Sequence, residues 1–286
     1  MPEGYELEPL DLSPPGLEAT RRLLAAAFPA AHHLDAAFLS WSYRDNPDGL
    51  AVGFNALHRD EVVAHIVMQP FRAHFDDRLE RGLLAYNTAT HPAHQGRGLF
   101  TAIGERTLAA AGDAGFDFAM AITNTNSTPG FVRKLGYQLV GSLDAKLGLG
   151  PLPRGGARTD ARYARHWDGE TLRWRLARPG NPYRVRRRGA RARILGPTGN
   201  AGIWAEIGEV AAADLGAGVA ELRALNPLRL WIGLDPARRW TGRAYLDVPV
   251  RLRPSPLNFV FLDLRGAGRR LAVDEIFFEI LDFDAY

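Results

Sequence analysis

The chain has 286 residues, which allows one or two domains of typical size, and a formal net charge of +3, which is too small to indicate nucleic-acid binding by itself. It contains no cysteine, which excludes disulfides, thiolate metal sites and a cysteine nucleophile. No run of about 18 apolar residues is present, and the N-terminal segment lacks the basic-then-apolar pattern of a secretory signal. We therefore expect a cytoplasmic protein without a membrane span.

Apolar periodicity predicts an N-terminal half in which helices and strands alternate. The predicted order is helices at 17–28 and 34–43, strands at 50–57, 62–69 and 83–90, a helix at 99–111, a strand at 115–122, a short helix at 127–135 and a strand at 137–146. Strands that flank helices in this order predict an α/β fold with a mixed sheet.

A segment rich in glycine and proline at 148–160 is predicted to link a domain at 1–147 to a second lobe at 161–286. The predicted order in this lobe is a helix at 167–177, two short strands within 183–195, a strand at 203–210, a helix at 211–225 and strands at 229–234, 244–250, 258–264 and 275–282. A weak repeat aligns Leu39 and Trp41 with Leu172 and Trp174. Either the two halves are related by duplication, or two amphipathic helices are alike by chance.

The segment that joins the strand at 83–90 to the helix at 99–111 has the character of an anion site. His91-Pro92 ends the strand, and a tight loop of sequence QGRG leads directly into the helix. The first N–H groups of a helix lack internal partners and carry partial positive charge, and glycine lets the backbone approach a phosphate closely. The alternative is an ordinary strand-to-helix turn, since neither the P-loop pattern nor the dinucleotide-binding GxGxxG pattern occurs in this loop.

The loop sequence QGRGLF, after a strand that ends in THP, resembles the acetyl-CoA pyrophosphate loop of the GNAT superfamily of N-acetyltransferases, whose pattern is Q/R-x-x-G-x-G/A. Gln95 and Gly98 match this pattern, whereas Phe100 occupies its last small position. A second segment at 124–137 is similar to the family's N-x-x-(S/A)…Y-x-K-x-G-F element. The resemblance implies a GNAT fold with a mixed central sheet, followed by a second, degenerate GNAT-like α/β lobe without a glycine loop.

The resemblance also implies a reaction: acetyl transfer from acetyl-CoA to a small amine or amino sugar, by direct attack of the amine. It implies that the backbone of Ala89 and Thr90 lies along the pantetheine arm of the cofactor. The residues implied around the pyrophosphate are Gln95, Gly96, Arg97, Gly98, Leu99 and Phe100, and those implied beside the thiol end are Asn124, Asn126 and Ser127. Turn chemistry at the start of a helix is the alternative for the two asparagines.

The catalytic groups depart from the family pattern. The frequent general-acid tyrosine falls on Val132, and Tyr137 falls on a packed aromatic position, so we expect it in the core. The strand before the loop contains no carboxylate, which leaves Tyr86 and Asn87, and strand alternation places these two on opposite sides. Tyr86 either holds a water that acts as base or is a buried, satisfied hydroxyl. The other candidate base is the terminal carboxylate of Tyr286, as in larger multi-lobed GNAT enzymes that this chain resembles; a frayed tail is the alternative.

Two further clusters have competing interpretations. His91 and His94 form an H-x-x-H pair in a loop without further ligands nearby, so no metal site is expected. Six arginines between Arg184 and Arg193 are more typical of a solvated strand face than of a nucleic-acid site, because no aromatics interleave with them. The same arginines are also suited to an acidic substrate or the 3′-phosphate of CoA. A non-catalytic acyl-CoA-binding module is the alternative function, favoured by the missing tyrosine and carboxylate.

Overall fold

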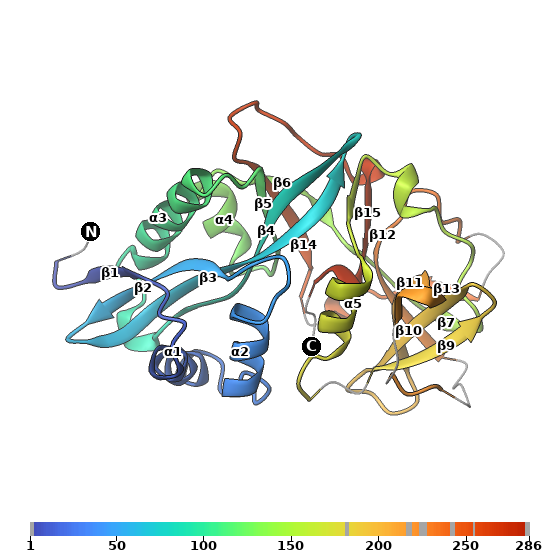
Figure 1. Cartoon of the computed structure of the whole chain (residues 1–286), viewed down its shortest axis with the longest axis horizontal. Coiled ribbons are helices and arrows are strands. Elements are labelled where there is room, and N and C mark those ends of the chain that lie inside the picture. Colours follow the sequence, from blue (N-terminus) through green and yellow to red (C-terminus); the bar gives the residue numbers. More distant parts are fainter. Residues whose placement is uncertain are drawn as a thin grey trace. The chain divides into compact units, whose positions relative to one another are not determined.

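The computed structural model describes residues 3–180, 183–215, 219–222, 228–240, 244–253 and 255–283. They form two compact units (Figure 1). The first unit comprises Met1–Phe71, Glu80–Leu139 and Phe259–Arg270, and the second comprises Arg72–Leu79, Val140–Asn258 and Leu271–Tyr286. The two units are therefore interleaved along the chain. The division of the chain into sequential domains at 1–147 and 161–286 stays a prediction.

The first unit is built on a mixed sheet with strand order β1-β2-β3-β4-β5-β14-β6. Its elements are β1 (Glu6–Pro9), α1 (Pro14–Ala27), α2 (Ala36–Tyr43), β2 (Val52–His58), β3 (Glu61–Phe75), β4 (Arg78–Thr90), α3 (Leu99–Asp113), β5 (Phe118–Thr123), α4 (Thr128–Lys134), β6 (Gln138–Ser142) and β14 (Asn258–Asp263). β1, β2 and β3 pair antiparallel, whereas β4 and β5 pair in parallel. Figure 1 shows α3 and α4 on one face of this sheet and α1 and α2 on the other.

The core of the first unit explains why α3 begins directly after the glycine loop. Leu99, Ile103 and Ala111 are buried at helical spacing and pack against the apolar faces of the strands. Burying a leucine or isoleucine side chain stabilises the fold by about 1.5 to 3 kcal/mol, and the smaller alanine contributes less. The helix is therefore anchored along its length, and its N-terminus is held at the carboxyl end of β4.

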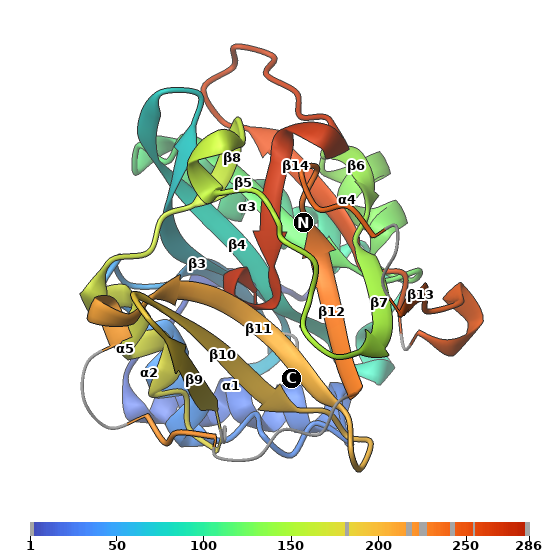
Figure 2. The same cartoon turned by 90° about the vertical axis from the view of Figure 1, so that its right-hand side faces the viewer.

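The second unit is also α/β, with strand order β8-β15-β12-β11-β10-β9 and with β7 pairing β12 and β13. Its elements are β7 (Asp144–Leu149), β8 (Tyr163–Arg165), α5 (Gly169–Leu176), β9 (Arg184–Arg188), β10 (Arg191–Pro197), β11 (Trp204–Ala211), β12 (Leu228–Leu234), β13 (Tyr245–Asp247) and β15 (Ile276–Glu279). In Figure 2, β9, β10 and β11 lie side by side. The hairpin predicted within 183–195 is confirmed as β9 and β10.

The helix predicted at 211–225 is wrong where the structure describes that segment. A short 3₁₀ turn, Ala212–Leu215, follows β11, and residues 219–222 are not helical. Among the described helices, none combines the length and apolarity needed to span a bilayer.

Candidate active site

The loop between β4 and α3 has the backbone of an anion site. Gly96 and Gly98 have φ angles of 74° and 76°, which glycine adopts readily. Gly98 is the N-cap of α3, and because it has no side chain it makes no capping hydrogen bond to this helix end. A Cβ added to either glycine would meet no atom within 4 Å, so the space beside both is open. An anionic group can therefore approach the first N–H groups of α3 without meeting a side chain.

Side chains beside the loop tie it to the rest of the first unit. The Gln95 amide donates to the carbonyl of Thr90 at 3.3 Å, and the Tyr5 hydroxyl bonds Nδ1 of His94 at 2.9 Å. Burial lowers the pKa of His94, and the neighbouring imidazoles and Arg97 lower it further. Arg97 itself is exposed, so it provides the permanent positive charge of the loop.

The parallel strands β4 and β5 pair over only four residues each. The register extends from Gly82 opposite Phe118 to Ala85 opposite Ala121, although β4 continues to Thr90. The backbone of Ala89 and Thr90 is therefore not engaged by β5. Two parallel strands whose pairing stops before they end leave backbone groups available to a ligand.

The polar residues at the end of β4 both contact α2. The Tyr86 hydroxyl bonds Oγ of Ser42, and Nδ2 of Asn87 donates to the Tyr43 hydroxyl at 3.3 Å. The prediction that Tyr86 and Asn87 face opposite sides is wrong. Asn87 has a φ of 48°, and this left-handed conformation breaks the alternation of side chains along the strand. The hydroxyl of Tyr86 is thus partnered, while its side chain stays half-buried.

A buried chain of hydrogen bonds, which the sequence analysis did not predict, runs from Asn87 through Tyr43 and His65 to Asn55. His65 is fully buried, and burial lowers its pKa to about 3, so its imidazole is neutral. Nδ1 of His65 is 2.7 Å from Oδ1 of Asn55, which can only accept, so Nδ1 carries the proton. Nε2 of His65 then accepts from the Tyr43 hydroxyl at 3.1 Å. The signal for this chain was the presence of Asn55 and His65 within otherwise apolar strands.

The turn before α4 uses Asn124 and Ser127 for its own hydrogen bonds. Oδ1 of Asn124 accepts from the N–H groups of Asn126 and Ser127, at 3.0 and 2.9 Å. The hydroxyl of Ser127 also donates to this oxygen, at 3.1 Å. These bonds match the turn chemistry that was the alternative for Asn124. A contact of Asn124, Asn126 or Ser127 with a cofactor stays a prediction.

Phe100, the large residue at the last position of the loop motif, turns into the core. Its ring packs edge to face on Phe131, with 5.5 Å between the ring centroids. A Cβ added to Gly130 would lie 2.8 Å from the Phe100 ring. Phe100 is therefore accommodated because α4 presents a glycine beneath it, and Leu99 beside it is buried. Contacts of Leu99 and Phe100 with a pyrophosphate stay a prediction.

Two acid or base groups of the first unit, Tyr137 and Glu80, have structural roles, and the family's tyrosine position is Val132. Val132 packs against the core, and Tyr137 is buried there as predicted, with its pKa raised by burial. Glu80, at the start of β4, is buried and bonded by Arg269 at 2.8 Å, so it is a structural ion pair. Tyr286, the other candidate base, lies outside the described residues.

Sequence comparison finds no protein-family model that matches the chain. No curated protein matches it either.

Solved structures do match, over nearly the whole chain. A GCN5-related N-acetyltransferase from Anabaena variabilis matches with a TM-score of 0.58 and 11% identity, covering 91% of this chain and 73% of that one. Eis1 from Mycobacterium abscessus matches with a TM-score of 0.56 and 13% identity, covering 91% and 73%. A probable N-acyltransferase from Enterococcus faecalis matches with a TM-score of 0.55 and 13% identity, covering 91% and 71%.

These matches define the class of fold. The chain has the fold of the GCN5-related N-acetyltransferases, the GNAT fold, over 91% of its length. The predicted fold class, a GNAT fold with a mixed sheet continued by a second α/β lobe, is confirmed.

Proposed function

We propose that this protein is an acetyl-CoA-dependent N-acetyltransferase that acts on a small amine or amino sugar. The observation that supports this most is the junction of β4 and α3. There a GNAT fold carries an uncapped helix N-terminus, two glycines with positive φ and open space beside both. These are the features that a diphosphate needs from a backbone.

The groups at this junction suit an acyl-CoA. The backbone of Gly96 and Gly98 and the first turn of α3 would hold the pyrophosphate, and exposed Arg97 would add a charged hydrogen bond. The backbone of Ala89 and Thr90, which β5 does not engage, would bind the pantetheine amides. Acetyl-CoA would supply an activated thioester carbonyl, so the protein need not form an acyl-enzyme.

We assign proton transfer to the hydroxyl groups of Tyr86, near the end of β4, and Ser42 of α2. An alkylamine of pKa about 10 is largely protonated at pH 7 and must lose a proton before it attacks. Tyr86 and Ser42 form a hydroxyl pair that can hold a water and orient the amine. Val132 donates no proton to the leaving thiolate. With a thiol pKa of about 8.5, the penalty at pH 7 is only about 2 kcal/mol. The terminal carboxylate of Tyr286 is the other candidate base.

The test is release of CoA thiol from acetyl-CoA in the presence of a panel of amines and amino sugars. We expect amine-dependent release by the wild type and its loss in Gly98→Asp. If CoA binds but no amine is acetylated, the alternative function, a non-catalytic acyl-CoA-binding module, is correct. Two observations favour that alternative: Val132 at the acid position, and the absence of a carboxylate among residues 83–90 at the end of β4.

A further inference from the structure

The second unit contains a large cavity whose walls are rich in arginine. Its volume is about 1400 Å³. Among the residues that the structure describes, ten arginines and four carboxylates line it, a formal excess of six positive charges. All of these described lining residues belong to the second unit. The glycine loop at 95–98 belongs to the first unit, so this cavity is a different site.

One wall of the cavity is the β9–β10 hairpin, which places like charges directly opposite each other. In the antiparallel register Arg193 faces Arg186, and Arg191 faces Arg188. Residues paired in this way have Cβ atoms about 5 Å apart, and like charges at this spacing destabilise a sheet. The hairpin therefore carries four guanidinium groups where the sheet alone would favour opposite charges.

The carboxylates in the cavity neutralise only part of this charge. Glu209 bonds both Arg191, at 3.1 Å, and Arg193, at 3.3 Å. Glu206 bonds Arg229 at 3.1 Å, and Glu279 bonds Arg158 at 3.2 Å. Arg154, Arg186, Arg187 and Arg188 line the cavity and form no ion pair with any residue that the structure describes.

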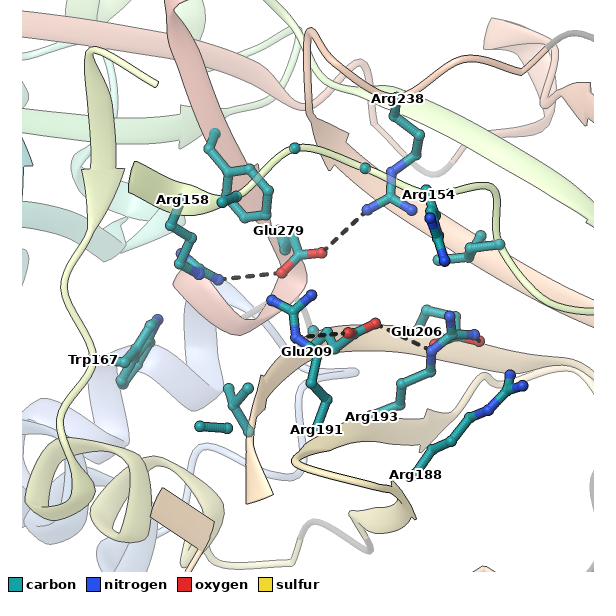
Figure 3. Close-up of a pocket in the computed structure, with 18 of the residues that line it drawn as sticks. Arg154, Arg158, Trp167, Arg188, Arg191, Arg193, Glu206, Glu209, Arg238 and Glu279 are labelled. Carbon is teal, nitrogen blue, oxygen red and sulfur yellow. Dashed lines mark hydrogen bonds and ion pairs between the residues drawn. The ribbon is translucent and has the colours of Figure 1, made fainter. Parts of the chain in front are cut away.

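The opposite wall adds two guanidinium groups, those of Arg154 and Arg238, and hydrogen bonds hold Arg238 in place. Figure 3 shows Arg154 and Arg238 on one side of the cavity and Arg188, Arg191 and Arg193 on the other. Arg238 donates to Asp235 at 3.1 Å and to the carbonyl of Pro153 at 2.8 Å. A ligand between the walls would thus meet positive charge on both sides.

We propose that this cavity binds a small molecule that carries two or more phosphate groups. Guanidinium groups bind phosphate oxygens bidentately, and several of them around one concave site match several phosphates. A nucleic acid fits less well, because Glu206, Glu209 and Glu279 interrupt the positive surface and the hairpin carries no aromatics for base stacking. Bound phosphates would also relieve the repulsion between the paired arginines of the hairpin.

The test is calorimetric titration with inorganic tripolyphosphate at low salt, alongside a thermal melt. We expect binding by the wild type that persists when the 95–98 loop is disrupted by Gly98→Asp, and a raised melting temperature with ligand. Arg186→Gln and Arg188→Gln should each weaken binding by about 10-fold or more, because each removes a charged hydrogen-bond donor. Arg239→Gln, an exposed arginine that does not line the cavity, is the matched control and should change affinity by less than about 2-fold.

Two further measurements distinguish loss of tripolyphosphate binding in the cavity from unfolding and from effects at the proposed cofactor site. Without ligand, Arg188→Gln should melt no lower than the wild type, because it removes a like-charge pair. Gly98→Asp should keep tripolyphosphate binding while it loses CoA binding. The proposed acetyltransferase function and the proposed phosphate site are thus tested independently of each other.

Four results would overturn the proposal. The first is no tripolyphosphate binding by the wild type at millimolar concentration. The second is an equal loss of affinity in Arg239→Gln, and the third is loss of tripolyphosphate binding in Gly98→Asp. The fourth is displacement of tripolyphosphate by a short DNA of higher affinity, which would make the cavity a nucleic-acid surface.

Discussion

We expect a Gly98→Asp variant to remain folded and to lose most of its affinity for CoA. Gly98 has a φ of 76°, so any other residue there is strained by about 1 to 2 kcal/mol, and aspartate by somewhat less. A Cβ at this position meets no atom within 4 Å, so no steric clash adds to the strain. Typical domains are stable by about 5 to 15 kcal/mol, and the folded state therefore survives.

The effect on binding is electrostatic. The new carboxylate would stand at the N-terminus of α3, where the proposed pyrophosphate needs the unpaired N–H groups. Two negative charges about 4 Å apart repel by about 1 kcal/mol in water and about 4 kcal/mol near a protein surface. A loss of about 2 kcal/mol corresponds to a CoA affinity about 30-fold weaker.

Calorimetric titration with CoA measures this loss, and Gly136→Asp is the matched control. Gly136 has a φ of 75° and also has open space beside its Cα, so its variant suffers the same strain. We expect Gly136→Asp to bind CoA within about 2-fold of the wild type, since like-charge repulsion is local. Gly98→Ala, which adds strain without charge, should lie between the two. A folded Gly98→Asp variant with wild-type CoA affinity would refute the assignment of this loop.

Further predictions concern the base, a buried acid and a helix cap. Tyr86→Phe should slow acetyl transfer by about 100-fold at unchanged CoA affinity. If both this variant and deletion of Tyr286 keep the wild-type rate and pH profile, neither group is the base. Burial raises the pKa of Glu279 from 4.5 to about 7, so the folded protein binds more protons than the unfolded chain between these values. The free energy of unfolding should therefore fall by about 3 kcal/mol as the pH rises through this window. Glu279→Gln should flatten that slope in urea titrations, and an unchanged slope would contradict the shift. Asp168→Ala should destabilise the fold by about 1 to 2 kcal/mol, because Asp168 caps α5 through the N–H of Thr171, whereas Asp168→Asn should retain most of the stability. Equal stability of the two variants in urea would show that the cap is unimportant.

Local signals determined the part of the site that could be predicted. Pro92, the glycines of the QGRG loop and the apolar spacing of 99–111 are sufficient to predict a strand, a loop and a helix N-terminus in that order, because each acts through its own backbone. The β9–β10 hairpin around Gly189 was predicted for the same reason, whereas the core position of Tyr137 was predicted from the family resemblance.

Tertiary structure alone decided which distant segments meet. β14 pairs between β5 and β6, so residues 259–263 complete the sheet of the first unit, and no local pattern indicates that partner. The positive φ of Asn87 brings its side chain to α2, which Tyr86 also contacts, whereas alternation predicted opposite sides. The arginines of β9 and β10 become a cavity wall only because Arg154 and Arg238 stand opposite them. Strand pairing and the approach of charged side chains across a cavity depend on residues far apart in the chain. The periodicity of apolar residues indicates only the local structure of a segment, so it cannot predict these contacts.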